Sequence, residues 1–223
     1  MDEEDFIDDA RTIGKQVKAD DTLSAHIRFL LNAFFEDTPV AAEHVLHAGR
    51  NSSVFALPKK VRLENKSFRL CLKVRKEFYA RDDAAGSEAY LYYALFKEFC
   101  KKGLAQKLID AQGFFVPRVV FVVKSGKQYG IVMEDVSNKR AYPLIDPVTQ
   151  GLGFTIVASY LKGISFRELV APVNAALHTY VDPHIIKDES GGRIVFLDLD
   201  FALGQGRFDY AEFLNVTQID ISQ

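Results

Sequence analysis

Residues 193–202 read Arg-Ile-Val-Phe-Leu-Asp-Leu-Asp-Phe-Ala, a short apolar run that ends in a carboxylate, followed two residues later by a second one. Side chains two residues apart on a strand point to the same face, so Asp198 and Asp200 are expected to face the same way. Buried carboxylates are costly unless they are paired or bind a metal. Two of them at the end of an apolar strand indicate a cation site whose oxygen ligands suit Mg²⁺. The alternative from this stretch alone is a strand that runs into a solvated turn.

The composition carries no dominant charge. The chain has 223 residues, of which 48% are hydrophobic, and a formal net charge of -2 at pH 7. This length suits one large domain or two small ones. A charge so close to zero argues against nucleic acid or an anionic membrane surface as a general partner. No apolar run approaches the roughly 18 residues that a membrane-spanning helix needs.

The N-terminus and the cysteines indicate the compartment. Residues 1–5 are acidic and lack the basic region of a secretory signal. Cys71 and Cys100 both lie within apolar segments, as small core residues do. This cysteine usage fits a reducing compartment, so we expect a cytoplasmic protein.

The first 43 residues are predicted to precede the main sheet. Residues 1–20 are charged and poor in large apolar groups, so we expect them to fray or to form a loose helix. Apolar residues from Leu23 to Phe35 recur at helical spacing, with Asp21 or Thr22 as the N-cap. The helix is expected to end before Pro39, which disfavours helix in the preceding residue. We expect this helix to cover one face of the sheet that later residues form.

The next part of the chain alternates with the period of β-strands. Strands are predicted at 45–46, 54–57, 68–74, 116–123 and 128–133, with a long helix over 84–102. The short turns predict an antiparallel sheet of five strands, with the helix inserted after the third strand.

The signals after residue 137 are less regular. Residues 142–147 and 180–186 are predicted as loops, and 165–178 as a helix interrupted at Pro172. Residues 194–198 form the strand quoted above, and the last twenty residues are expected to contain one packed helix.

A turn, a strand and a helix in the first half carry a family resemblance. Residues 47–55 contain Gly49, Ser52 and Val54, the third strand contains Lys73, and the long helix contains Glu88. With the order of elements, this resembles the protein-kinase-like fold, which includes the aminoglycoside and choline phosphotransferases. In the kinase pattern G-x-G-x-x-G-x-V, Gly49 stands at the second glycine, Ser52 at the third, and Val54 at the valine.

The resemblance assigns a nucleotide site to these residues. A kinase strand lysine holds the α- and β-phosphates and is oriented by a helix glutamate, which implies these roles for Lys73 and Glu88. Met133 would be the gatekeeper, and the backbone from Glu134 to Val136 would bind adenine. Considered singly, Lys73 can also be a solvated edge charge and Glu88 a surface helix charge.

The stretch quoted first matches the D-F-G element that binds metal. Asp198 takes the place of its aspartate, and Asp200 is a second candidate metal ligand. Another register uses Asp200-Phe201-Ala202 as the triplet; we prefer Asp198 because it directly ends the apolar strand.

The catalytic loop departs from the family pattern H-x-D-x-x-x-x-N. Aligned on His178, the aspartate becomes Tyr180 and the asparagine becomes Ile185, and neither side chain can do that work. In a second register, Asp182 keeps the catalytic carboxylate in an Asp-Pro-His sequence, but the asparagine is lost. The alternative for Asp182 is an ordinary turn before Pro183.

These expectations combine into an α+β, bilobal, kinase-like fold. Residues 1–43 form an N-terminal acidic segment and helix, 44–136 an N-lobe with a five-stranded antiparallel sheet, and 137–223 a truncated, mostly helical C-lobe. The resemblance implies transfer of the γ-phosphoryl group of ATP, with Mg²⁺, to a hydroxyl of a protein or small molecule. Two alternatives are a catalytically inactive kinase-like binding or scaffold protein, and an unrelated α+β domain with the same strand order.

Overall fold

The structure is a computed structural model that describes residues 3–64, 66–104, 117, 119–135, 139–143, 184–188, 194–197 and 210–222. The chain divides into two compact units, which we name after their sheets. The large-sheet unit comprises Glu4–Ala89, Arg118–Asp135 and Asp209–Gln223. The small-sheet unit comprises Met1–Glu3, Tyr90–Pro117 and Val136–Phe208.

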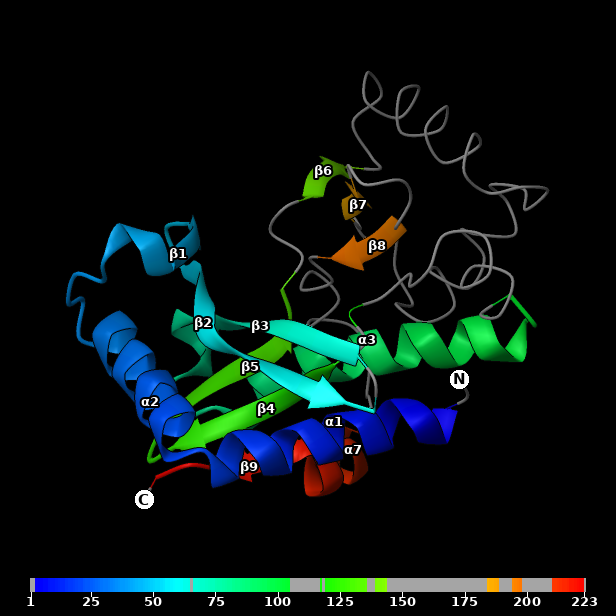
Figure 1. Cartoon of the computed structure of the whole chain (residues 1–223), viewed down its shortest axis with the longest axis horizontal. Coiled ribbons are helices and arrows are strands. Elements are labelled where there is room, and N and C mark those ends of the chain that lie inside the picture. Colours follow the sequence, from blue (N-terminus) through cyan, green and yellow to red (C-terminus); the bar gives the residue numbers. More distant parts are fainter. Residues whose placement is uncertain are drawn as a thin grey trace. The chain divides into compact units, whose positions relative to one another are not determined.

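The large-sheet unit is built on six strands (Figure 1). They are β1 (Val45–Ala48), β2 (Ser52–Leu63), β3 (Lys66–Arg75), β4 (Val120–Ser125), β5 (Gln128–Glu134) and β9 (Gln218–Asp220). Their order across the sheet is β1-β2-β3-β5-β4-β9. All neighbours are antiparallel except β4 and β9, which are parallel.

The sheet is therefore mixed and six-stranded, and the prediction of a five-stranded antiparallel sheet is wrong. The additional strand, β9, comes from near the C-terminus and pairs with the outer edge of β4. Beyond it, the Ile221 N–H donates to the Lys124 carbonyl at 2.9 Å. An edge strand presents unpaired backbone N–H and carbonyl groups, and on β4 these groups pair with β9. Three residues are too few to show strand periodicity in a sequence.

Helix α1 (Glu3–Ala19) is regular, so of the two expectations for residues 1–20, fraying or a loose helix, the helix is the one found. Phe6, Ala10, Ile13 and Val17 recur every three or four residues and are all fully buried. The helix packs closely on the C-terminal strand, because a Cβ at Gly14 would overlap the Ile219 side chain. Packing of this narrow apolar stripe stabilises a helix whose composition is mostly polar.

A single residue, Asp20, separates the end of α1 from the start of helix α2 (Asp21–Phe35). Its N-cap is Asp20, one residue earlier than predicted, whose carboxylate accepts from the Leu23 N–H at 3.0 Å. Lys59 on β2 contacts the same carboxylate at 2.7 Å. The predicted covering of the sheet is confirmed, since α1 and α2 residues share one buried core with the sheet.

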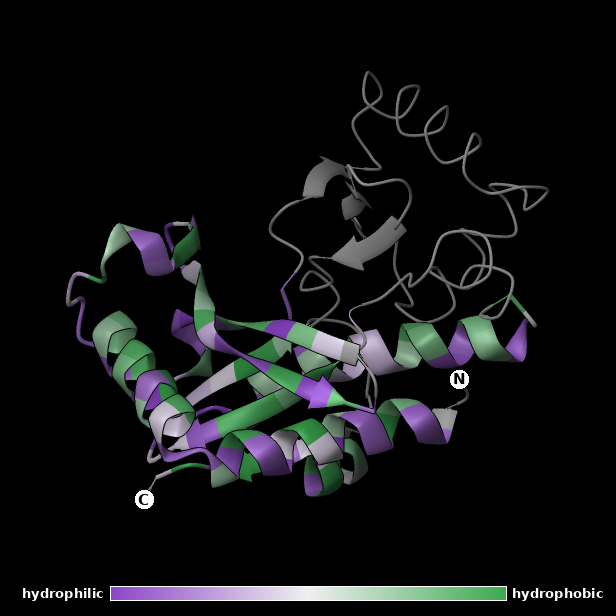
Figure 2. Cartoon of the chain, viewed as in Figure 1, coloured by the Kyte–Doolittle hydropathy of each residue, from purple (hydrophilic) through white to green (hydrophobic). Residues whose placement is uncertain are grey.

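That core lies on one face of the sheet, which we call the helix-covered face. It contains Phe55, Leu70, Leu72, Phe121 and Val132, which alternate with residues of the opposite face. Figure 2 shows the resulting contrast between hydrophobic strand segments and the mixed surface of α1. Gly130 permits a close approach here, because a Cβ would lie 2.7 Å from Leu72 Cδ1.

Helix α3 (Asp82–Lys101) confirms the predicted long helix and begins in the large-sheet unit. Helix α7 (Tyr210–Thr217) confirms the helix expected near the C-terminus. The two helices meet at Gly86, where a Cβ would lie 2.6 to 3.0 Å from three carbons of Leu214.

The small-sheet unit contains β6 (Lys139–Pro143), β7 (His184–Asp188) and β8 (Ile194–Leu197), paired antiparallel in that order. The strand predicted at 194–198 is confirmed as far as Leu197. Residues 142–143 and 184–186 were predicted as loops and lie in strands. Pro143 ends the first of these segments and Pro183 precedes the second, and prolines favour turns locally. Pairing between segments that are distant in the chain nevertheless places both in strands.

Candidate functional site

Lys73 lies near the end of β3, the strand between β2 and β5. It stands opposite Val54 on β2 and Ile131 on β5. Directly opposite residues in antiparallel strands share a face, so these three side chains form a row across the sheet. Since Leu70, Leu72 and Val74 belong to the helix-covered face, Lys73 lies on the other face, which we call the lysine face.

The Lys73 ammonium is paired with the carboxylate of Glu88 on α3. Lys73 Nζ lies 2.6 Å from Glu88 Oε1, and the side chains are 9% and 0% exposed. The ion pair predicted from the sequence is therefore present, and the solvated alternatives for both residues are wrong. A pair this well buried contributes little net stability, but it holds the ammonium in one place.

Arg75 is a third member of this cluster that the sequence analysis missed. Its Nη1 donates to Glu88 Oε2 at 3.4 Å, so the two carboxylate oxygens contact two different cations. Arg75 Nε also donates to Glu77 at 3.4 Å, a side chain that is 46% exposed. The sequence could have indicated this contact, because Arg75 lies two residues after Lys73 on the same strand and residues at that spacing share a face.

The predicted phosphate-loop residues lie at the end of the sheet where Lys73 and Arg75 stand. Gly49 follows β1, and its N–H donates to the Ser52 carbonyl at 2.8 Å, which closes the β1–β2 turn. A Cβ at Gly49 would lie 3.2 Å from that carbonyl oxygen. Ser52 stands opposite Arg75, and Val54 stands opposite Lys73. The turn is thus anchored beside the two cations.

Met133 and Glu134 end β5 on the far side of β3. Met133 stands opposite Cys71, whose thiol donates to the Glu134 carbonyl at 3.8 Å. Burial raises the pKa of the Cys71 thiol, which keeps the donor proton in place. The Glu134 N–H donates to Val119 and the Asp135 N–H to Arg69, at 3.0 and 2.8 Å. Both amides therefore already have backbone acceptors.

The remaining predicted site residues lie outside the described part of the chain. They are Val136, Asp182, Asp198 and Asp200, and the alternative catalytic position Tyr180 lies there too. In the described residues, no three His, Cys, Asp or Glu side chains gather as a metal site.

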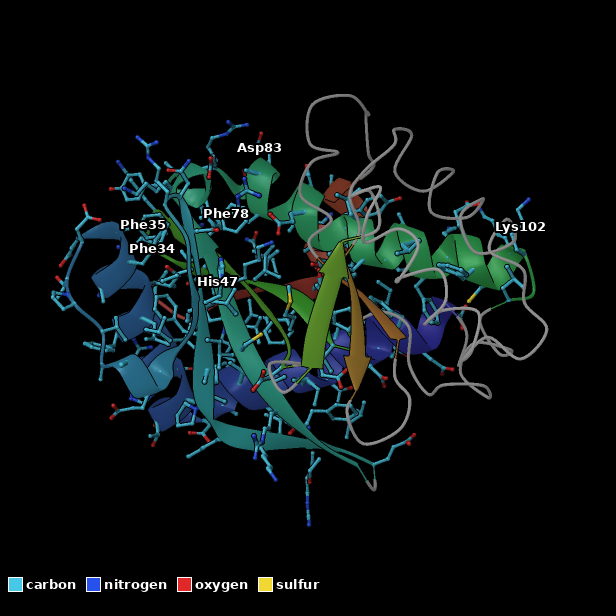
Figure 3. All side chains as sticks on the ribbon, turned by 90° about the horizontal axis from the view of Figure 1, so that it is seen from above. Phe34, Phe35, His47, Phe78, Asp83 and Lys102 are labelled. Carbon is cyan, nitrogen blue, oxygen red and sulfur yellow. The ribbon has the colours of Figure 1, made fainter. Side chains whose placement is uncertain are left out.

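A separate hollow of about 250 Å³ opens at the end of α2. Phe34, Phe35, Asp37, Lys76 and Tyr79 line it, and the Phe35 and Tyr79 rings are 5.4 Å apart. Figure 3 shows both phenylalanines at the end of α2, near Phe78. The hollow shares no lining residue with the Lys73–Glu88–Arg75 cluster.

Comparisons with known proteins leave the cluster as the main guide to function. No family model matches the chain, and neither a curated protein nor a solved structure matches it. Within the described ranges, no helix has the length and apolarity needed to cross a membrane.

The cluster can present positive charge to an anion. Lys73 and Arg75 carry two positive charges around one fully buried carboxylate, and Glu77 is screened by solvent. A fixed ammonium beside a tight turn is an arrangement suited to phosphate groups.

Proposed function

We propose that this chain binds ATP with Mg²⁺ on the lysine face and transfers the γ-phosphoryl group to a hydroxyl of a protein or small molecule. The observation that carries the proposal is the Lys73–Glu88 ion pair, 2.6 Å long and buried, between the strand and the helix. Lys73 would bind the α- and β-phosphates, and Glu88 would orient it. The turn from Gly49 to Ser52 would cover the phosphates.

The other roles are assigned from the sequence resemblance. Asp198 and Asp200 would hold Mg²⁺, and Asp182 would position the acceptor hydroxyl. Catalysis would consist mostly of positioning and charge neutralisation, as in other phosphoryl transfers. The fold and the proposed lobes would then form a protein-kinase-like phosphotransferase.

A thermal-shift titration with ATP and Mg²⁺ tests the binding step. At 100 times its Kd, a ligand stabilises the folded state by about 2.7 kcal/mol. We expect a metal-dependent shift in the wild type that Lys73→Ala abolishes. The matched control is Lys60→Ala, which removes an exposed lysine from β2. No shift at millimolar nucleotide, or the same shift in Lys73→Ala, would contradict the proposal.

A second candidate is a nucleotide-binding protein without catalysis. The sequence observation that favours it is the catalytic loop, where neither register keeps the asparagine that holds a second metal in kinases. Turnover separates the two candidates. The enzyme is supported if the chain hydrolyses or transfers the γ-phosphate and Asp198→Asn abolishes this turnover without changing the unfolding transition. Nucleotide binding without turnover supports the inactive protein.

A further inference from the structure

We propose that the hollow at the end of α2 binds a free α-amino acid with an aromatic side chain. Aromatic walls contact the ring of the ligand, and one carboxylate and one ammonium at the rim pair with its two charged groups. The hollow shares no lining residue with the Lys73–Glu88–Arg75 cluster, so this site does not depend on the proposed function.

The walls of the hollow are aromatic. Phe34 and Phe35 end α2, and Tyr79 follows the short helix η2 (Lys76–Phe78). The Phe35 and Tyr79 rings are 5.4 Å apart and tilted by 58°, and the Phe34 and Phe35 rings are 5.2 Å apart at 82°. Aromatic rings prefer such tilted and edge-to-face contacts, at about 4.5–7 Å between centroids. A further ring can join this set on its open side, so an aromatic side chain suits these walls.

The Tyr79 ring is exposed on a fixed segment of backbone. It is 51% exposed, and among the large apolar side chains that the structure describes only Phe29 is equally exposed. The preceding Phe78 is fully buried, and the N–H of the following Ala80 donates to the Lys127 carbonyl at 2.6 Å. The ring is therefore held in place before a ligand arrives, which lowers the entropic cost of binding.

Asp37 and Lys76 add opposite charges at the rim of the hollow. Asp37 Oδ1 lies 4.0 Å from Lys76 Nζ, and the two side chains are 83% and 56% exposed. An α-amino acid carries its ammonium and its carboxylate on the same carbon, so its two charges have a similar spacing. The ammonium of the ligand pairs with Asp37 and its carboxylate with Lys76, through charge-assisted hydrogen bonds.

The size of the hollow selects a small ligand. Its volume is about 250 Å³, whereas sites for drug-sized molecules have about 300–1,000 Å³. A single amino acid fits this space better than a nucleotide or a peptide segment. Burial of the ring supplies most of the affinity, because exposed ion pairs contribute little. The rim charges instead select a ligand that carries both signs.

The competing explanation is a ligand with only one charge. A quaternary ammonium can bind to aromatic faces beside Asp37, but the Lys76 ammonium would oppose it. An anion would be attracted by Lys76 and opposed by Asp37. Only a zwitterion is favoured by both rim charges. Removal of either charge therefore weakens the binding of a zwitterion, whereas a singly charged ligand gains from one removal and loses from the other.

The test is a calorimetric titration of the full chain with L-phenylalanine. We expect saturable binding at millimolar concentration or below. N-acetyl-L-phenylalanine lacks the ammonium and L-phenylalaninamide lacks the carboxylate, so each should bind about threefold more weakly. L-serine, which has both charges but no ring, should not bind in this range.

Variants of the lining residues locate the binding. Asp37→Asn and Lys76→Gln should each weaken L-phenylalanine binding about threefold, and Tyr79→Ala at least about tenfold. Asparagine is tolerated at position 37, where φ is 53°. Phe29→Ala is the matched control, because it removes an equally exposed ring from α2 outside the hollow and should leave the affinity unchanged.

Four results would overturn the inference. The first is no saturable binding of millimolar L-phenylalanine. The second is equal affinity for N-acetyl-L-phenylalanine, which means that only the ring is recognised. The third is opposite effects of Asp37→Asn and Lys76→Gln, which indicate a singly charged ligand. The fourth is a loss in Phe29→Ala as large as in Tyr79→Ala, which places the binding elsewhere. If Tyr79→Ala does not fold, the two rim variants decide.

Discussion

Alternate residues of β3 point to opposite faces of the sheet, and the two faces differ in the side chains that they bury. Leu70, Leu72 and Val74 enter the helix-covered face, where α1 and α2 complete an apolar core. Lys73 and Arg75 enter the lysine face, where they surround the buried carboxylate of Glu88. Apolar burial stabilises both faces, since Ile131 and Val122 in the row of Lys73 are also fully buried, whereas the buried ion pair mainly imposes a geometry. The ion pair can therefore be tested apart from the core beneath α1 and α2.

The largest effect is expected on the lysine face, from Glu88→Ala. This change removes a carboxylate from between two cations, and breaking a buried ion pair costs about 3–5 kcal/mol. Urea unfolding of the full chain measures the loss. Glu98→Ala is the control on the same helix, because the Glu98 pair with the exposed Lys101 is worth at most about 1 kcal/mol.

A paired replacement distinguishes geometry from stability on this face. Lys73→Met combined with Glu88→Leu exchanges the ion pair for apolar side chains, and such exchanges are often neutral or stabilising. We expect the double variant to unfold at higher urea than Glu88→Ala and to show no response to Mg·ATP. A double variant as unstable as Glu88→Ala would mean that the ion pair is itself a main source of stability.

A comparable loss is expected on the helix-covered face, from Leu72→Ala. Leu72 is fully buried, and removing a core leucine costs about 2–5 kcal/mol through lost burial and a cavity. Leu72→Met, which conserves volume, should cost less than about 1.5 kcal/mol. In contrast to Glu88→Ala, any nucleotide affinity should survive below the unfolding transition. A selective loss of affinity in Leu72→Ala would show that the two faces are coupled.

A smaller effect is expected where α3 meets α7, from Gly86→Ala. Alanine favours the helix by about 1 kcal/mol, but its Cβ would press on Leu214 and overpacking costs about 1–3 kcal/mol. We expect a net loss of about 1 kcal/mol in chemical unfolding, as the difference of these two effects. In a chain that also carries Leu214→Ala, Gly86→Ala should increase the free energy of unfolding, because the Leu214 side chain no longer blocks the added Cβ. An increase from Gly86→Ala alone would contradict the close packing.

The smallest effect is a pH dependence at His26 on α2. Burial, with a contribution from His44, lowers the pKa of His26 below its ordinary 6.5. The unfolded chain therefore takes up the proton first, and stability is lost as pH falls from about 6.5 through the lower folded pKa. His26→Gln should flatten the pH dependence of the unfolding free energy in this range, which urea unfolding at a series of pH values measures.

Much of the large-sheet unit was predictable because its signals are local. Strand alternation separates Leu72 from Lys73, and helical spacing defines α3, whereas the Lys73–Glu88 pair was predicted from the family resemblance. The role of Arg75 was missed because an arginine at a strand end resembles a surface charge until its partner is known. Helix α1 was expected only as a loose helix or a frayed segment, because four buried apolar side chains in a polar segment give a weak signal.

The sequence alone determined which residues of β2, β3, β5 and α3 share a face, since backbone geometry imposes that periodicity on any chain. Only the tertiary structure decided that β9 completes the sheet beside β4, that α1 is a regular, packed helix and not a frayed segment, and that Glu88 contacts two cations. Each of these depends on groups far apart in the chain, and their pairing is selected by the burial and hydrogen bonding that the folded state provides.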